Sequence, residues 1–416
     1  MLSIFSKIFQ NKVFIVLAIL IVITFPNTLY KQSDKDTTIV ATSIGIDKKD
    51  NKYSVSILAV IPKGESDVNS NLEIFEAEGE TVSSALDAIT LDIGRKIGLA
   101  HCDCILFTEA IMLDNLTQIL DYFTRTANLS TNPTLIATPN SAKDLLEAVK
   151  TSNNLLDLSL KNIISSQEDR TLLKNITLDR FYRAYFSPNS TFTIPILTVD
   201  KGSNQSNQDS DSNNLPESSS GTASDGSSKG GQSSKIKNDN EIAIIQDGRM
   251  IGKLSKDEQF IYNLLTKPSS YQKFTLNTIN DENFKNSTVV FQEADKFIIP
   301  KYKFVDGKPV VEYKIWLSVM IDEVKSTDNN SYSSISGTQN FLTDTIKSEF
   351  NKLVAEKLTI TNSLMQENKY DILNLFSKFN AYKYRKFYDY LQSIDNQTEY
   401  MQDMSIEISV KLNYVI

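Results

Sequence analysis

The stretch TIVATSIGIDKKDNKYSVSILAVI, residues 38–61, contains two β-rich runs on either side of a polar turn. Residues 38–46 and 53–61 are dominated by β-branched and apolar side chains, whereas residues 47–52 are polar or charged. This composition predicts two strands joined by a turn. A third strand is expected at residues 72–77, so the stretch opens a sheet.

Helical and strand patterns alternate from this sheet to about residue 200. Thr81 is predicted to begin a helix, because apolar residues recur from there at helical spacing as far as Ile97. Asp114 and Ser141 are predicted to cap two further helices. The short strands expected between and after the helices cover residues 102–107, 133–138 and 191–199. We interpret residues 38–200 as one mixed α/β domain.

Residues 201–240 differ sharply in composition from what precedes them. Ser, Asn, Gly and Asp dominate the segment, which has no aromatic residue and almost no apolar one. Such a segment cannot bury enough apolar surface to offset the entropy cost of ordering its backbone. It is therefore predicted to be a disordered linker between two parts of the chain.

After the linker, residues 241–285 are predicted to form a small domain made of a hairpin and a helix. Two strands, at 242–245 and 250–254, flank Asp247-Gly248, the dipeptide that favours a type I′ turn. A helix at 255–265 and a strand at 274–279 follow.

Residues 286–416 are predicted to form a third, α/β domain. The strands expected at 297–305 and 310–321 are joined by a second Asp-Gly pair, and helices are expected at 338–358, 370–379 and 382–391. From Met404 to Ile416 apolar and polar residues alternate, which predicts a half-buried final strand. The fold class is therefore α+β or mixed α/β, with three domains.

The first thirty residues have the character of a membrane segment. Lys7 and Lys12 precede an apolar run from Val13 to Phe25, and no acidic residue occurs before Asp34. Extended to residue 30, the run reaches about the 18–20 residues that a membrane span requires. We predict an uncleaved anchor at residues 1–30 with the N-terminus in the cytoplasm, although a removed signal peptide is the alternative.

The composition argues against several classes of protein. A net charge of −8 disfavours nucleic-acid binding, which needs a concentrated basic face. A single histidine removes most zinc hydrolases and Ser-His-Asp enzymes. We find no catalytic constellation and predict no cofactor, so the chain is interpreted as a non-enzyme.

Two clusters have both a functional and a structural interpretation. His101-Cys102-Asp103-Cys104 could bind a soft metal or exchange thiols, but two small thiols in a strand are also ordinary core residues, and His101 could satisfy a neighbouring backbone group. The run from Tyr382 to Tyr388 could touch a membrane or a partner, or form a helix that packs in the core with a solvated basic face.

Beyond the anchor, a series of local motifs is similar to a known family. In chain order these are Ser43-Ile44-Gly45-Ile46-Asp47, Glu78-Gly79-Glu80-Thr81, His101 before a strand that leads to Glu109, Asp121-Tyr122-Phe123-Thr124-Arg125, the hairpin Ile245 to Leu254, and Asp371-Ile372-Leu373. The set resembles the Ger(x)C family, the C subunits of the nutrient germinant receptors of spore formers. The residues that match family motifs are Gly45, Asp47, Gly79, His101, Glu109, Arg125, Gly248, Gly252 and Asp371.

One feature departs from the family pattern. Members usually carry a lipobox cysteine just before the first strand, whereas Leu29 and Tyr30 stand at that place here. The resemblance implies a three-domain, non-catalytic subunit on the outer face of the spore inner membrane. It also implies two partners, a membrane-embedded A subunit and a transporter-like B subunit. Without the cysteine, the apolar segment itself would have to hold the protein in the membrane.

Two other functions stay open from the sequence. One is an anchored extracytoplasmic sensor or solute-binding protein unrelated to germination, which would need a defined cavity with convergent polar groups. The other is an envelope redox or metal protein that uses Cys102, Cys104 and His101.

Overall fold

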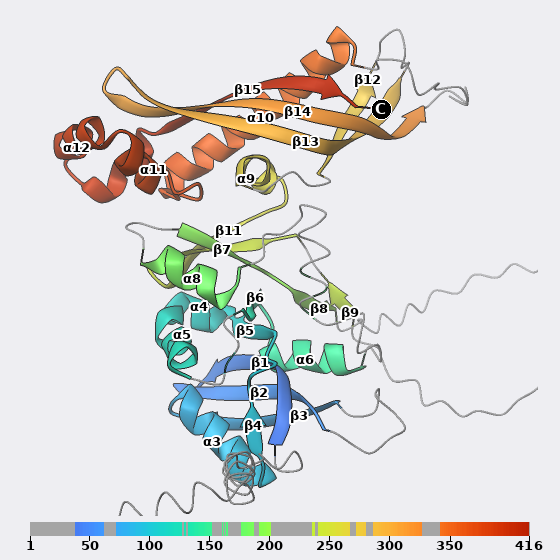
Figure 1. The fold of residues 1–416 in the computed structure, drawn as a ribbon, viewed down its shortest axis with the longest axis vertical. Helices are drawn as coiled ribbons and strands as arrows, with labels where there is room; N and C mark the ends of the chain where they lie inside the picture. The colour runs from blue at the N-terminus through green and yellow to red at the C-terminus, as the bar shows by residue number, and fades with distance from the viewer. Residues whose placement is uncertain are drawn as a thin grey trace, which may run out of the picture.

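The computed structural model describes residues 38–61, 72–126, 132–151, 176–186, 191–200, 235–237, 240–266, 272–279, 286–326 and 342–415, with isolated positions between 129 and 164. The predicted anchor at 1–30 and nearly all of the predicted linker at 201–240 lie outside these residues. Within the part of the chain that is described, no helix is both long and apolar enough to cross a membrane. The described part is elongated, with one sheet at each end and a smaller one between them (Figure 1).

The N-terminal sheet has six strands in the order β3-β2-β1-β5-β6, and β4 also pairs with β1. Its strands are β1 Thr38–Lys49, β2 Lys52–Val60, β3 Leu72–Gly79, β4 Lys96–Gly98, β5 Cys104–Thr108 and β6 Thr134–Thr138. The three strands predicted from the opening stretch and residues 72–77 are confirmed as the antiparallel β1, β2 and β3. Parallel pairing of β1 with β5 and of β5 with β6 completes a mixed sheet.

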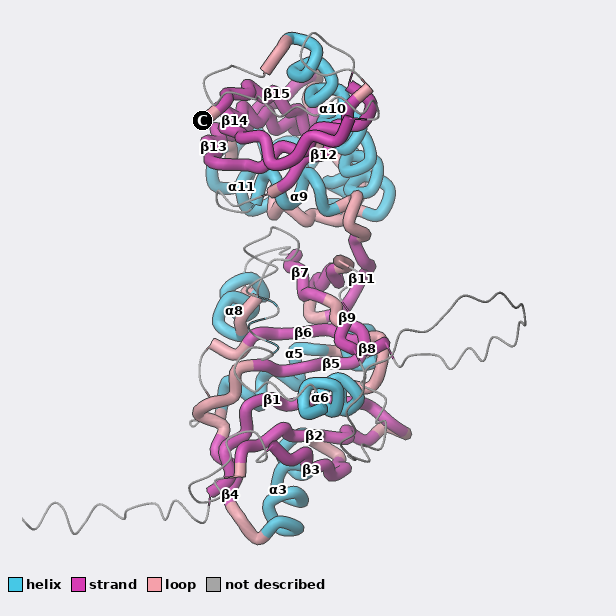
Figure 2. Tube along the Cα trace, turned by 90° about the vertical axis from the view of Figure 1, so that its right-hand side faces the viewer, coloured by secondary structure: helices cyan, strands magenta, loops and turns pink. Residues whose placement is uncertain are grey.

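Helices cover both faces of this sheet (Figure 2). They are α3 Val82–Ile93, α4 Glu109–Asp114, α5 Leu116–Arg125, α6 Ala142–Thr151 and α8 Leu178–Tyr185. Alternate residues of β5 point to opposite faces: Ile105 packs in one buried cluster with α3 and α5, whereas Leu106 packs in another with α6. The first predicted domain is therefore a three-layer arrangement around a central sheet.

Two helix ends around the N-terminal sheet differ from the sequence prediction. The Thr81 side chain caps α3 as expected, but the helix stops at Gly94, whose φ of 66° is left-handed. Ile97, predicted to lie on the helix, therefore belongs to β4. Asp114 ends α4 rather than capping the next helix, since the adjacent Asn115 side chain accepts a hydrogen bond from the amide of Thr117 in α5.

The middle sheet joins strands from both sides of the linker. It has the order β11-β10-β7, formed by β7 Thr191–Pro195, β10 Ile242–Gln246 and β11 Arg249–Leu254. The hairpin of β10 and β11 confirms the prediction, but β10 also pairs antiparallel with β7, which precedes the linker. A two-stranded sheet pairs β8 Thr198–Asp200 with β9 Lys235–Lys237. Residues 235–237, predicted to belong to the disordered linker, therefore form a strand.

The C-terminal sheet has the order β12-β13-β14-β15. Its strands are β12 Lys273–Ile279, β13 Ser287–Val305, β14 Lys308–Ser326 and β15 Ser405–Tyr414. β13 and β14 are longer than predicted and form one hairpin along their whole length. The alternating C-terminus is confirmed as β15, which pairs parallel to β14.

Helices pack on one side of the C-terminal sheet (Figure 1). They are α9 Gln259–Thr266, α10 Asp344–Asn368, α11 Leu375–Tyr382 and α12 Tyr384–Ser393, followed by the 3-10 helix η3 Gln397–Gln402. The Thr343 side chain caps α10, and Lys369 ends it with a φ of 60°, so α10 begins and ends later than the predicted 338–358.

The hydrogen bonding crosses the predicted divisions at residues 241 and 285. The hairpin shares a sheet with β7, and β12 shares a sheet with β13. Independent folding of the three predicted domains, at residues 38–200, 241–285 and 286–416, remains a prediction.

Candidate functional site: the hairpin junction

We call the N-terminal sheet with its helices the N-terminal lobe, and the C-terminal sheet with its helices the C-terminal lobe. The hairpin of β10 and β11 meets the N-terminal lobe through its turn. Asp247 and Gly248 have φ angles of 50° and 76°, the geometry of the predicted type I′ turn. The Gly248 carbonyl accepts a hydrogen bond of 2.8 Å from the amide of Leu116 at the start of α5. A Cβ on Gly248 would lie 2.0 Å from Thr117 Oγ1. The turn therefore needs glycine both for its φ and for its lack of a side chain.

An ion pair makes a second contact between the hairpin and this lobe. Lys253 Nζ of β11 lies 2.8 Å from Glu109 Oε2 at the start of α4, and each side chain is 34% exposed. A pair this accessible to water contributes about 0–1 kcal/mol. Its main effect is to orient the hairpin against α4.

On its other side the hairpin contacts the C-terminal lobe through Tyr370. The phenol oxygen of Tyr370 donates a hydrogen bond of 2.7 Å to the carbonyl oxygen of Ile251. The ring packs so closely on Gly252 that a Cβ there would lie 2.3 Å from the phenol oxygen and 2.8 Å from Cζ. One short hairpin thus contacts both lobes through two glycines.

Asp371, the residue after Tyr370, organises the start of α11. It is fully buried, and its carboxylate accepts hydrogen bonds from the amides of Leu375 (2.6 Å) and Phe376 (2.8 Å) and from the hydroxyl of Tyr400 (2.7 Å). Burial raises the pKa of Asp371, and the three donors oppose that shift. Burial and the neighbouring Asp371 also raise the pKa of Tyr400. These bonds hold in place the segment that carries Tyr370.

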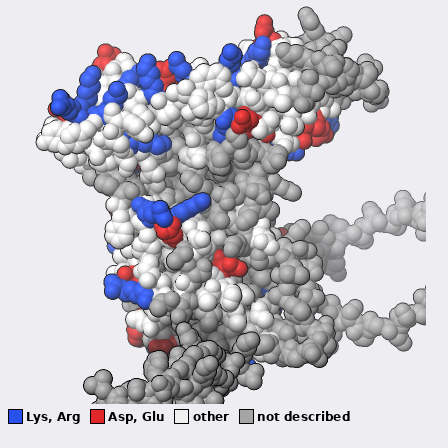
Figure 3. All heavy atoms as spheres, viewed as in Figure 1, with Lys and Arg blue, Asp and Glu red and all other residues white. Residues whose placement is uncertain are grey.

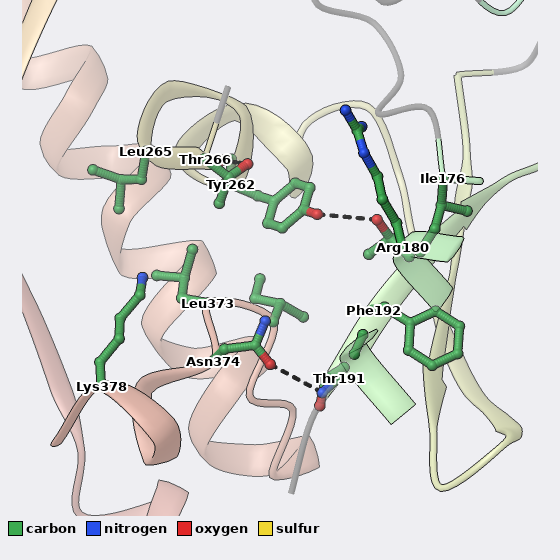
Figure 4. A pocket seen from close by; sticks show the side chains of 13 residues that line it. Ile176, Arg180, Thr191, Phe192, Tyr262, Leu265, Thr266, Leu373, Asn374 and Lys378 are labelled. Carbon is green, nitrogen blue, oxygen red and sulfur yellow. Dashed lines mark hydrogen bonds between the residues drawn. The ribbon is translucent and has the colours of Figure 1, made fainter. Parts of the chain in front are cut away.

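Two more hydrogen bonds connect the middle sheet to the C-terminal lobe (Figure 4). Asn374 Oδ1 accepts a bond of 3.1 Å from the amide of Thr191 in β7. The hydroxyls of Thr193 and Tyr262 lie 3.0 Å apart, joining β7 to α9. We refer to the contacts of the hairpin and of β7 with both lobes as the hairpin junction.

A cavity of about 390 Å³ lies within this junction, between β7, α8, α9 and the start of α11. Figure 4 shows Tyr262 and Asn374 reaching toward β7 across it. Its walls mix hydroxyl and amide groups with apolar side chains such as Leu373. Its volume is within the range of about 300–1,000 Å³ typical of small-molecule sites.

The first family motif lies in the N-terminal lobe, where Gly45 and Asp47 both hold α6. A Cβ on Gly45 would lie 3.0 Å from Ala142 Cβ, so the helix packs directly on the strand. The Asp47 carboxylate accepts hydrogen bonds from the amides of Ala142 (2.9 Å) and Lys143 (3.4 Å) and from the hydroxyl of Ser141 (3.2 Å). Burial raises the pKa of Asp47, and these bonds oppose the shift. Asp47 thus caps a helix that begins 95 residues later in the chain.

The remaining motif residues lie apart from the hairpin junction. A Cβ on Gly79 would lie 2.5 Å from the amide nitrogen of Ala85, so the N-terminus of α3 approaches the end of β3 closely. His101 is exposed in the turn that precedes β5. Arg125 forms an exposed ion pair of 2.7 Å with Asp121 on the same helix. The structure therefore brings together Glu109, Gly248, Gly252 and Asp371, but not the other five.

The cysteines are core residues, as the structural interpretation of their cluster predicts. Cys102 and Cys104 are each 1% exposed and are not in a disulfide. Burial raises the pKa of the Cys102 thiol to about 12, which disfavours the thiolate needed for metal binding or thiol exchange. Among the described residues no group of three or more His, Cys, Asp and Glu side chains is arranged to hold a metal ion.

Sequence reasoning missed Tyr370, Asn374 and Tyr400 as members of the junction. Tyr370 directly precedes the Asp371 motif, and this position was the only sequence signal that could have pointed to it. Asn374 has a φ of 52°, a conformation that asparagine tolerates better than most residues. Tyr400 is 29 positions from Asp371, so no local pattern connects the two.

Two family models match this chain, one on each side of the predicted linker. A family model described as "Spore germination protein N-terminal domain" matches residues 32–199, and one described as "Spore germination B3/GerAC like, C-terminal" matches residues 240–414. The crystal structure of the GerBC protein aligns with 90% of this chain and 97% of its own at 14% identity, with a TM-score of 0.48. A search of curated proteins finds no match. Since the two family models together cover most of the sequence, the chain belongs to the Ger(x)C family of spore germination proteins.

Proposed function

We propose that this protein is the C-type subunit of a spore nutrient germinant receptor and acts as a non-catalytic assembly and signalling component. The observation that carries the proposal is the hairpin junction. Glu109, Gly248, Gly252 and Asp371, all matched to family motifs, make or support contacts between one hairpin and both lobes. Such contacts hold the two lobes in a fixed relation, which supports a role in assembly and signalling.

The proposed partners are the A-type and B-type membrane subunits of the receptor. The proposed location is the spore inner membrane, with a single span at residues 1–30 and residues 38–416 on its outer face. The apolar run from Val13 to Phe25 and the absence of a cysteine near Leu29 and Tyr30 support this placement.

The anchor has a direct test. We expect the mature protein to retain Lys7, to resist alkaline carbonate extraction and to incorporate no labelled fatty acid. A soluble protein that starts near Leu29 would contradict the proposed span.

The receptor role is tested by deleting the gene. We expect normal growth and sporulation, together with spores that lose or slow their response to one class of nutrient. Germination by agents that bypass receptors should stay normal. Complementation with the wild-type gene should restore the response, and a variant with Asp371→Ala should restore it less. Deletion spores that germinate normally on every nutrient would contradict the proposal.

An extracytoplasmic solute-binding role is a second candidate, which the 390 Å³ cavity favours. If a nutrient binds there, it should raise the unfolding temperature of the purified protein, because a ligand that binds only the folded state stabilises it. Replacing Thr193 with valine, which removes the hydroxyl on the cavity wall, should reduce that shift. A Thr42→Val variant is the control, because Thr42 makes its hydrogen bond in the N-terminal sheet.

A further inference from the structure

A second concave surface lies at the far end of the C-terminal lobe. Residues 301–304 of β13 and residues 381–386 at the corner between α11 and α12 enclose a groove of about 590 Å³. We call it the basic groove. It shares no residue with the hairpin junction.

The charge of the groove is opposite to that of the chain. Five of its ten lining residues are Lys or Arg and none is acidic, whereas the whole protein has a net charge of −8. Lys303 is already paired with Glu407 at 2.7 Å. Lys383, Arg385 and Lys386 are exposed at the corner, and in Figure 3 basic side chains gather at the upper left, where Figure 1 places α11 and α12. The groove is thus suited to an anionic partner.

Exposed tyrosines surround these cations. Tyr382 is 68% exposed and stacks on Tyr302, with ring centroids 5.2 Å apart. Tyr384 and Tyr388, which are 59% and 52% exposed, stack on each other at 6.2 Å. Tyrosine provides a large contact area at a low entropy cost, and it is enriched where proteins bind partners.

The groove follows an open edge of the C-terminal sheet. β13 pairs with β14 as far as Val305, but on its other side its bonds to β12 and the preceding Gln272 extend only to Glu293. Beyond that point, no other strand of the described residues joins this edge. Neighbouring residues of a strand point to opposite faces of the sheet. Since residues 301–304 of β13 all line the groove, the groove runs along the edge of the sheet rather than over one face. An open edge presents backbone donors and acceptors to an added strand.

We propose that the basic groove receives an extended acidic segment of a partner protein, which adds to β13 as a further strand. Backbone hydrogen bonds to the edge would provide the binding mode, as in other cases of strand addition. Carboxylates of the segment would lie near Lys383, Arg385 and Lys386, and its apolar side chains would lie against Tyr382 and Tyr384.

A protein partner fits this surface better than an anionic membrane does. The groove is concave and includes a strand edge, whereas a bilayer surface offers no backbone groups to pair with it. Strand β1, which the N-terminal segment precedes, lies in the lobe at the opposite end of the long axis (Figure 1). If that segment is the anchor, which rests on the proposed function, the groove belongs to the lobe farther from the membrane.

Binding can be tested with the full chain in a neutral detergent and a fluorescent peptide of about ten residues that alternates Glu and Val. We expect saturable binding by anisotropy that weakens as salt is added. The triple variant Lys383→Glu, Arg385→Glu, Lys386→Glu should bind at least about tenfold more weakly. The matched control Arg95→Glu, Lys96→Glu, Lys150→Glu changes three exposed cations of the N-terminal lobe and should bind within about twofold of wild type.

Two further arms separate strand addition from other kinds of binding. Two further peptides carry N-methyl groups on alternate residues, one at the odd positions and one at the even positions. One of the two should bind at least about tenfold more weakly than the unmethylated peptide, because methylation removes the backbone donors that face the edge. Sedimentation with phosphatidylglycerol vesicles tests the membrane alternative.

Several outcomes would overturn the proposal. These are no binding of the Glu-Val peptide, full binding of both methylated peptides, equal loss in the control triple, and vesicle binding through the groove without peptide binding. Because none of these measurements uses germination, failure here is distinct from failure of the proposed receptor role.

Discussion

Tyr370 occupies the space that a side chain on Gly252 would need. A Cβ at that position would lie 2.3 Å from the tyrosine oxygen, and the same oxygen donates its hydrogen to the carbonyl of Ile251. The ring and the hairpin backbone are therefore in direct contact. The position of the hairpin against the C-terminal lobe thus depends on Gly252 having no side chain.

Gly252→Ala should therefore destabilise the protein by about 1–3 kcal/mol, since the ring or the hairpin must shift. Tyr370→Ala removes the obstacle and should also cost stability through the lost contact. The double variant should be less destabilised than the sum of the two single ones, because the clash is then absent. Urea denaturation of the four proteins measures this coupling. Strict additivity would mean that the two residues are not in contact.

Removing the carboxylate of Asp371 should have a larger effect than most surface changes. Asp371→Ala leaves two amides of α11 and the hydroxyl of Tyr400 without their acceptor. A buried donor that loses its partner costs about 1–3 kcal/mol. Thermal unfolding should show the loss, whereas Asp395→Ala, at an exposed position after α12, should change stability by less than about 0.5 kcal/mol.

Asp371 should also make stability depend on pH. Its pKa is raised in the folded protein, so folding favours the protonated form. The associated stability is fully present below the unfolded pKa of about 3.9 and declines as pH rises through the raised folded value. Wild type should therefore lose stability relative to Asp371→Asn as the pH rises from about 4 toward neutral. A constant difference across that range would show that the carboxyl group titrates as it does in the unfolded chain.

Asp47→Ala should loosen the first turn of α6. The change removes the acceptor for the amides of Ala142 and Lys143, and losing a helix cap costs about 0.5–2 kcal/mol. Hydrogen exchange at these two amides should become faster. Asp87→Ala, on the exposed side of α3, is the control and should leave exchange in α6 unchanged.

The thiols of Cys102 and Cys104 should be unreactive in the folded protein. Both are buried, and the raised pKa of Cys102, about 12, keeps its thiol protonated at pH 8. A thiol reagent should therefore label the two cysteines only after denaturation. Replacing both with alanine should cost about 1–3 kcal/mol each. Rapid labelling of the native protein would revive the redox interpretation.

Much of the secondary structure could be predicted because the signals are local. The β-rich runs at 38–46 and 53–61, the cap at Thr81 and the Asp247-Gly248 turn each depend on neighbouring residues, and all three form. The first turn is shorter than predicted, because β1 continues to Lys49 and includes Asp47. The misplaced helix end at Ile97 is also informative. The apolar spacing continues past Gly94 to Ile97 and so predicts a longer helix. The left-handed backbone of Gly94 ends the helix before that point.

The pairing of strands could not be predicted in the same way. β7 and β10 are separated by the whole linker, and β15 lies parallel to β14 although α10, α11 and α12 intervene. The alternation of β15 indicated a half-buried strand, but alternation does not identify the neighbour. Strand pairing follows from which surfaces remain to be buried once the local elements have formed.

The sequence by itself determined the elements, their order and the motifs that place the chain in its family. Only the tertiary structure showed what the motif residues do. Asp47 caps a helix 95 positions away, Asp371 binds Tyr400, and Gly252 accommodates Tyr370. The physical reason is distance along the chain: propensities, caps and turns depend on adjacent residues, whereas a buried carboxylate or a close-packed glycine is defined by partners that only the folded chain brings near.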